Sequence, residues 1–422
     1  MAVSPPPSTV IRTRSSLLYV PFGLLNATIA GVLGIALPLF AGEPGLASLA
    51  GALLNLGLAV GAPVAGWLSA RLSRVRALAG SLLGASMAVL AFALPQPVIF
   101  LSATLAVGLC ASVGLTLATL FVMGWYPKGR WDAQIGWLQT WMGAGQVLGL
   151  LTASVVTGRR ELAVLSAGLL LGAAAWAVRL PPPTATGAAL RPGHAIRRSP
   201  RTEVVEVMTL HHLAAFHPRE WPILRQRAVL VFLVPWSLVQ LGTAPLFALY
   251  PLLLHARFGL PTSVAAGLFA LAALVGAILY EPAGALTKRY GATRVLVVSY
   301  AARALALALV AGAILLRAAP WAAGGFVLVV AIWSFLAVAG NARVADLAPP
   351  GSAGAEFGAV AAVATLARVE GNLLAGTLVA GLGYGAIVGA GAALLGLATL
   401  WAALASRSAD TRGSPSTSPQ AS

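Results

Sequence analysis

Charged side chains are scarce in this sequence. Asp, Glu, Lys and Arg make up 9% of its 422 residues, whereas soluble domains contain about 25%. This scarcity excludes a water-soluble globular fold, because such a fold covers its surface with charged residues. Cysteine is scarcer still: Cys110 is the only one, so no intrachain disulfide can form, and its apolar neighbours indicate an inert core position.

Long apolar runs take the place of the missing charges. Hydrophobic residues reach 59% of the chain, and the mean hydropathy is +0.88. A helix rises 1.5 Å per residue, so about 20 residues cross the ~30 Å hydrocarbon core of a bilayer. Runs of this length predict twelve transmembrane helices, at 17–40, 44–70, 77–94, 98–123, 135–156, 161–180, 228–254, 261–284, 294–316, 320–345, 355–380 and 384–405. The predicted fold class is therefore an all-α integral membrane protein.

The predicted helices fall into two groups of six around one long polar interval. Between the tails 1–16 and 406–422, we expect an N-terminal six-helix bundle at 17–180, a central loop at 181–227 and a C-terminal six-helix bundle at 228–405. The first helix runs into a second apolar segment without a small-residue cleavage site, so we interpret it as a retained helix and not as a signal peptide.

Positive charge is distributed unevenly along the chain. Most of the 27 Lys and Arg residues lie in the tails, the central interval and the loops that follow even-numbered helices. The positive-inside rule makes these segments cytoplasmic. The opposite loops contain Arg159, Arg160, Arg257 and Arg317, of which the pair Arg159-Arg160 is the main exception to the rule. We therefore expect a multi-pass protein of the plasma (inner) membrane with both termini cytoplasmic, and the net charge of +16 needs no nucleic-acid partner.

The two halves of the chain repeat each other. The apolar ends of the first and seventh predicted helices correspond, as do glycines in the second and eighth. In the fifth and eleventh helices, Gln146 and Gly149 match Arg368 and Gly371 at the same spacing. Each half is thus one six-helix unit, and pseudo-symmetric repeats of this kind are typical of transporters.

The loops after the second and eighth helices contain the clearest repeat. The first copy includes Gly66, Arg71, Arg74 and Arg76, and the second includes Gly284, Lys288, Arg289, Gly291 and Arg294. Both copies resemble the gating-loop signature of the major facilitator superfamily, and the resemblance extends over roughly 17–405. It implies a twelve-helix transporter, similar to exporters of drugs or metabolites. The signature's acidic residue is replaced by Ala70 and Lys288, and Ser73 replaces its second glycine.

The fifth predicted helix contains glycines at Gly143, Gly145 and Gly149. They match part of the glycine-rich motif of antiporters, without its proline. The alternative is that these glycines serve helix packing alone, because small residues let transmembrane helices approach closely.

Two charges lie near the middle of the predicted helix 355–380, Arg368 and Glu370. A charge at bilayer depth costs at least ~2.5 kcal/mol, so it usually faces a partner or a cavity. The two residues are two positions apart and cannot form an intrahelical pair. We expect Glu370 to carry a proton and Arg368 to bind an anionic substrate group; the alternative is that both only fix helix packing.

Further candidates for this site are polar and aromatic residues of other predicted helices. Asn372 shares a stripe with Arg368, and candidate partners of the two charges are Asn26, Asn55, Gln139, Gln146 and Gln240. Candidates to line an apolar cavity are Trp137, Trp141, Trp236 and Trp333. Glu281 and Arg303 are placed near cytoplasmic helix ends, where they either join Lys288 and Arg289 in a gate or extend to the interface.

These features predict a secondary active transporter that moves a small organic molecule by alternating access, exporting it, with protons as a candidate coupling ion. The alternatives are a metabolite importer or symporter, and a non-transporting membrane enzyme or receptor. We expect no enzyme and no cofactor, because HExxH, GxSxG, paired-aspartate and P-loop motifs are missing. No metal site is expected, since His211, His212 and His217 lack a ligand spacing. The expected partners are the substrate and the lipid bilayer, and the expected state is a monomer.

Overall fold

The fold is known from a computed structural model, which describes residues 16–126, 131–156, 158–181, 226–347 and 353–410. Every regular element in these ranges is a helix. This confirms the predicted all-α class. The histidines of the central loop, and most of the two tails and of that loop, lie outside the described residues.

The N-terminal bundle contains the first six predicted helices. The first is divided into η1 (Ser16–Tyr19), α1 (Val20–Asn26), the π-helical η2 (Ala27–Val32) and α2 (Leu33–Ala41). The others are α3 (Pro44–Arg71), α4 (Arg74–Leu90) extended by η3 (Ala91–Ala93), α5 (Pro97–Trp125), α6 (Trp131–Val155) and α7 (Arg159–Ala177).

The C-terminal bundle contains the remaining six. They are α9 (Arg227–Phe258), α10 (Thr262–Tyr290), α11 (Ala292–Leu315), the pair α12 (Ala319–Ala331) and α13 (Trp333–Leu347), α14 (Ala353–Leu382) and α15 (Tyr384–Asp410). By length and composition, ten of the described helices are able to cross a membrane, with α12 and α13 forming one span. α6 and α14 are not among the ten.

The helix boundaries follow local signals in the sequence. Pro44 and Pro97 stand in the first turns of α3 and α5, where a proline loses no hydrogen bond. Gly291 has a φ of 83°, which favours glycine, between α10 and α11. At the corresponding turn, Ser73 has a φ of −61° and its side chain accepts a hydrogen bond from the Arg76 backbone. A helix cap therefore explains the serine that replaces the signature's glycine.

Arg159 joins three helix ends at one side of the N-terminal bundle. Its guanidinium donates to the backbone oxygens of Phe40 at 2.9 Å, Phe92 at 2.7 Å and Leu94 at 3.1 Å. It also lies over the rings of Phe40 and Phe100, 5.4 Å and 5.8 Å from their centroids. The guanidinium donates to backbone oxygens at helix ends that have no partner within their own helices. The arginine therefore stabilises the place where these helix ends meet. These contacts give Arg159, the first residue of α7, a structural role at a place where the charge distribution predicts few cations.

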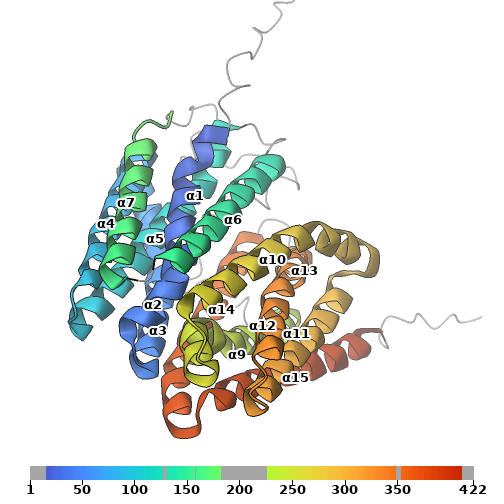
Figure 1. The fold of residues 1–422 in the computed structure, drawn as a ribbon. Coiled ribbons are helices and arrows are strands. Elements are labelled where there is room, and N and C mark those ends of the chain that lie inside the picture. The colour runs from blue at the N-terminus through green and yellow to red at the C-terminus, as the bar shows by residue number, and fades with distance from the viewer. Residues whose placement is uncertain (1–15, 127–130, 157, 182–225, 348–352, 411–422) are drawn as a thin grey trace, which may run out of the picture.

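The two bundles have separate apolar cores and meet at one end. α3 packs on α14, and α6 packs on α10. A Cβ at Gly376 would lie 2.9 Å from the Cα of Gly45. A Cβ at Gly51 would lie 3.3 Å from the Cβ of Ala248. Figure 1 shows the bundles meeting at α3 and α14 and standing at an angle to each other. The contact lies at the first turns of α3, so it is remote from Arg71 at the other end of that helix.

Candidate functional site

Arg368 contacts side chains from two other helices of the C-terminal bundle. Its Nε donates to Gln240 Oε1 on α9 at 2.8 Å, and its guanidinium carbon lies 5.9 Å from the centroid of Trp333, the first residue of α13. Gln240 is 2% exposed. The prediction that Gln240 is a partner of Arg368 is therefore confirmed as a contact.

Arg303 contacts the same tryptophan from a third helix. It stands near the middle of α11 and is only 1% exposed. Its guanidinium carbon lies 5.3 Å from the Trp333 centroid and 5.7 Å from that of Phe247. Two of its nitrogens, Nε and Nη1, have no hydrogen-bond partner among the described residues. The expectation that Arg303 extends to a helix end is thus wrong.

The sequence of α11 does not show which of its faces is buried. The buried face contains Leu296, Ser299, Tyr300, Leu307 and Val310, and Arg303 falls on it by the three- and four-residue spacing of a helix. The opposite face is also apolar, with Val298 and Leu305 exposed, so only packing distinguishes the two. The contact with Phe247 likewise depends on how α9 crosses α11.

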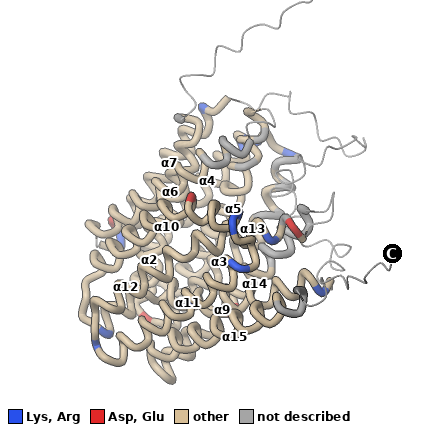
Figure 2. The backbone as a smooth tube through the Cα atoms, turned by 90° about the vertical axis from the view of Figure 1, so that its right-hand side faces the viewer, with Lys and Arg blue, Asp and Glu red and all other residues tan. Residues whose placement is uncertain are grey.

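The two arginines form a cationic cluster without acidic partners in the described part of the chain. Both guanidinium carbons lie near the same indole ring, 5.3 Å and 5.9 Å from the Trp333 centroid. In the view of Figure 2, blue positions fall in the middle of the helix assembly as well as at its ends. Indole faces attract guanidinium groups through cation–π contact, which holds the cations but does not neutralise them. The cluster is therefore electropositive in a surrounding of low dielectric.

Of the four predicted cavity tryptophans, Trp333 belongs to this cluster and Trp236 lies beside it. The rings of Trp236 and Trp333 lie 5.8 Å apart, and Trp236 packs over Gly340. Trp141 instead packs on the backbone of Gly23 in the N-terminal bundle. Trp137 is 57% exposed. The structure thus brings together Trp236 and Trp333 and leaves the other two apart.

Glu370 does not share the environment of Arg368. It is exposed, on a stripe of α14 with the exposed leucines Leu366, Leu373 and Leu374. Arg368 lies on the side of α14 that faces α9. The two charges therefore point to different sides of the helix, as their spacing predicts.

The other predicted polar candidates lie at helix crossings or on the surface. Asn26 Nδ2 donates to the backbone oxygen of Met142 at 2.7 Å, which links α1 to α6. Gln146 is partly buried and Gln139 is exposed. Asn372 is 2% exposed, and a Cβ at Gly51 would lie 3.0 Å from its Nδ2. Asn372 therefore stands at the contact between the bundles, one turn from Arg368.

Two glycines of α6, Gly145 and Gly149, pack closely against the first helix. A Cβ at Gly145 would collide with the backbone oxygen of Gly23, and one at Gly149 would collide with that of Ala27. The repeat-related Gly371 meets the backbone oxygen of Leu241 in the same way. In each bundle, then, the glycine of the fifth helix lets it approach the first, so the sequence repeat is a structural repeat.

The predicted gating-loop residues lie at the end of the bundles opposite to their contact. Arg74 Nη1 donates to the backbone oxygen of Leu120 at 2.9 Å, and Arg289 lies 5.1 Å from the ring centroid of Tyr290. Gly66 and Gly284 lie inside α3 and α10. The remaining members, Arg71, Arg76, Lys288 and Arg294, are exposed. The second copy thus presents several cations at this end.

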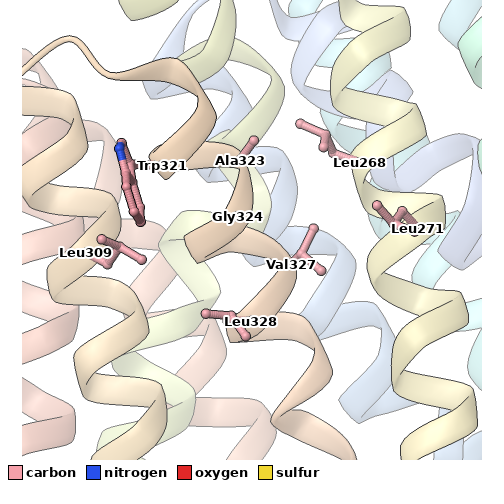
Figure 3. Close-up of a pocket in the computed structure, with 8 residues that line it drawn as sticks. All are labelled: Leu268, Leu271, Leu309, Trp321, Ala323, Gly324, Val327 and Leu328. Carbon is pink, nitrogen blue, oxygen red and sulfur yellow. The ribbon is translucent and has the colours of Figure 1, made fainter.

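A pocket of about 490 Å³ lies between α10, α11 and α12, away from the charged cluster. Figure 3 shows Leu268 and Leu271 from α10 on the side of α12 where Val327 lies, and Leu309 and Trp321 on its other side, with Leu328. Leu271, Leu328 and Trp321 are among the exposed apolar residues. The lining is apolar, so it offers a substrate no hydrogen bond that would fix its orientation.

Comparisons with known proteins agree with this architecture. The family model of the Major Facilitator Superfamily matches residues 20–371. No curated protein matches the sequence. The structure is similar to that of the nucleoside transporter NupG, with 13% identity and a TM-score of 0.71 over 93% of this chain and 97% of that chain.

Two further solved structures are similar. The human organic anion transporter MFSD10 (TETRAN) has 17% identity and a TM-score of 0.63, over 92% of this chain and 99% of that chain. The xylose transporter XylE from E. coli, in a partially occluded inward open conformation, has 14% identity and a TM-score of 0.66 over 92% and 97%. At these identities the likeness concerns the fold.

Proposed function

The chain belongs to the major facilitator superfamily, and from this premise we propose that it is a secondary active transporter that moves a small organic molecule across the plasma membrane by alternating access. The members and structural neighbours are transporters and not enzymes, which confirms the expectation that this chain is no enzyme. It is a multi-pass membrane protein.

The observation that carries the proposal is that the two six-helix bundles meet at one end, through α3 on α14 and α6 on α10. Gly45, Ser48 and Gly376 let α3 and α14 cross closely at one end. Contacts through small residues can slide or separate without large side-chain rearrangement. Rocking of the bundles about this region opens a path to one side of the membrane at a time.

The orientation follows from the distribution of positive charge. With both termini and the central loop in the cytoplasm, the contact between the bundles lies at the outer side and the structure faces inward. A reporter fused near residue 200 tests this: activity of a cytoplasmic reporter supports it, and activity of a periplasmic reporter overturns it.

Export is the direction that we propose, because aromatic and apolar side chains surround the cluster of Arg368 and Trp333. Everted membrane vesicles that contain the protein should accumulate radiolabelled aromatic acids faster than vesicles without it. Uptake by intact cells instead would favour the alternative, an importer. Purified, folded protein that moves no compound in either direction would contradict transport altogether.

Proton coupling is proposed for Glu370. A carboxylate near the middle of α14 is costly in a bilayer, so it usually faces a partner or a cavity. In proteoliposomes with an imposed pH gradient, Glu370→Gln should abolish gradient-driven flux and retain exchange of substrate for substrate. The control Glu281→Gln, an exposed carboxylate on α10, should keep both. Full gradient-driven flux in the Glu370→Gln protein would contradict proton coupling through Glu370.

A further inference from the structure

We propose that the arginine cluster, which consists of Arg303, Arg368, Gln240 and Trp333, binds the oxyanion group of an organic substrate. The anionic group is a carboxylate or a phosphate, and the apolar part of the substrate lies against Trp333 and Trp236. The inference rests on the proposed transport function and names the chemical class of its substrate.

The unpartnered polar atoms of the cluster are hydrogen-bond donors. Arg303 Nε, Arg303 Nη1 and Gln240 Nε2 are buried and have no partner among the described residues. Arg368 Nε already uses Gln240 Oε1, which leaves the amide nitrogen of Gln240 to donate elsewhere. A set of free donors calls for a ligand rich in acceptors, and an oxyanion offers two or three acceptor oxygens.

The charge of the cluster points to the same ligand. Both guanidinium groups lie near one indole ring, and neither forms an ion pair in the described part of the chain. A buried charge without a partner is strongly unfavourable, and two like charges add their repulsion. Binding of one anion between them removes both costs at once. Guanidinium is also the side-chain group that matches carboxylate and phosphate in a bidentate geometry.

The aromatic surroundings favour an organic anion over an inorganic one. Phe247 covers one side of Arg303. Trp333 and Trp236 extend the apolar surface, and their ring centroids lie 5.8 Å apart. A ring attracts a guanidinium group without accepting hydrogen bonds from all of its N–H groups, so Arg303 Nε and Nη1 remain available to the ligand. An inorganic ion has no apolar part to place against the rings.

The cluster is positioned where binding can affect the contact between the bundles. Arg368 on α14 is one turn from Asn372, which meets α3 at Gly51. The helix that supplies Trp333 is interrupted at Ile332, immediately before it. Breaks in transmembrane helices are common at transporter substrate sites. A ligand that draws Arg368 toward Arg303 therefore acts directly on the helix that forms the bundle interface.

The test uses the full-length protein in detergent and pairs of compounds that differ mainly in charge. The probes are benzoate with benzamide, hexanoate with hexanamide, and phenyl phosphate with phenyl acetate, beside sodium chloride and sodium phosphate. Binding is followed by tryptophan fluorescence and by the melting temperature. Arg303→Gln and Arg368→Gln each remove one charge, and Arg317→Gln removes an exposed cation at the end of α11 as a matched control.

We expect at least one organic anion to bind the wild type and its neutral counterpart not to bind. Each arginine substitution should weaken that binding by about 10- to 100-fold, the usual worth of a charge-assisted contact, and Arg317→Gln should leave it unchanged. Without ligand, Arg303→Gln should melt no lower than the wild type, because an unpaired buried charge is removed. A purely structural arginine would instead lower the melting temperature.

Three results would overturn the proposal: no anion of the panel binding better than its neutral counterpart, chloride or phosphate alone giving the full effect, or binding unaffected by both arginine substitutions.

Flux assays separate this proposal from the proposed function. Binding that depends on the arginines, without flux in proteoliposomes, contradicts transport and leaves the anion site standing. Flux of neutral compounds that ignores both substitutions contradicts the anion site and leaves transport standing.

Discussion

Single arginines have opposite roles in the two bundles. Arg159 contacts three backbone oxygens and two aromatic rings. Arg303 is buried as deeply as any side chain of its size, yet two of its nitrogens lack partners among the described residues. The first pattern is that of a residue that stabilises the fold, and the second is that of a residue available to a ligand.

Replacing Arg159 should therefore affect stability. Arg159→Ala leaves the carbonyl oxygens of Phe40, Phe92 and Leu94 without their donor, which we expect to cost about 3 kcal/mol. Arg159→Lys should recover part of this loss, since one ammonium group cannot reach three oxygens as the guanidinium does. The melting temperature of the purified protein measures both effects.

The neighbouring Arg160 is the matched control. It is exposed, so Arg160→Ala should change stability by no more than about 0.5 kcal/mol. Equal melting temperatures for the Arg159→Ala and Arg160→Ala proteins would mean that the three helix ends are not held by Arg159.

At the scale of single residues, the sequence predicted the candidate residues better than it predicted the direction of their side chains. Arg368 was predicted from its depth in an apolar segment, and Gln240 was among its predicted partners. Arg303 was predicted near a helix end, and its burial could not be read from the sequence because both faces of α11 are apolar. The separation of Glu370 from Arg368 followed from helix geometry alone.

Among the helices, close crossings depend on glycine. α6 lies against the first helix where Gly145 and Gly149 meet the backbone oxygens of Gly23 and Ala27. The contact falls at the start of the π-helical turn η2, which begins at Ala27. π-Helical turns are often found at functional sites. The glycines of α6 thus place an irregular turn of the first helix beside the fifth.

A pair of glycine substitutions on α6 separates packing from other effects. Gly149→Ala should destabilise the protein by about 1–3 kcal/mol, because the new methyl group meets backbone that cannot move aside. A Cβ at Gly143 would meet no described atom within 4 Å, so Gly143→Ala should be neutral or stabilise the helix by up to about 1 kcal/mol. Thermal unfolding in detergent measures both effects. A Gly149→Ala protein as stable as the wild type would contradict the close contact of α6 with the first helix.

The twelve helices were predictable because bilayer thickness fixes their length. The repeat of Gln146 and Gly149 with Arg368 and Gly371 also predicted that α6 and α14 are equivalent. The π-helical turn at Ala27 and the break at Ile332 were not predicted. Neither place has a proline or another residue type that marks an irregular turn in the sequence. Both depend on packing against neighbouring helices.

On the scale of the whole molecule, the two bundles touch at one end and diverge toward the other (Figure 1). This arrangement could not be deduced from apolar periodicity, because every helix is apolar on several sides. Only the small residues of α3 and α14, such as Gly45 and Gly376, hint at a close contact. The uneven distribution of charge predicts which end faces the cytoplasm, and it says nothing of how far the bundles separate there.

Alternating access is the central claim, and distances between spin labels at the two ends test it most directly. On a Cys110→Ala background, one pair of labels at Leu72 and Tyr290 reports on the end where the bundles diverge. A second pair at Glu43 and His255 reports on the end where they meet, and all four positions are exposed.

Electron–electron double resonance in lipid nanodiscs, with and without the anions that bind, gives the distance distributions of both pairs. The account predicts two populations at each end and opposite shifts, so that the Leu72–Tyr290 distance shortens when the Glu43–His255 distance lengthens. A single unchanged distribution at both ends, in every condition, would contradict it.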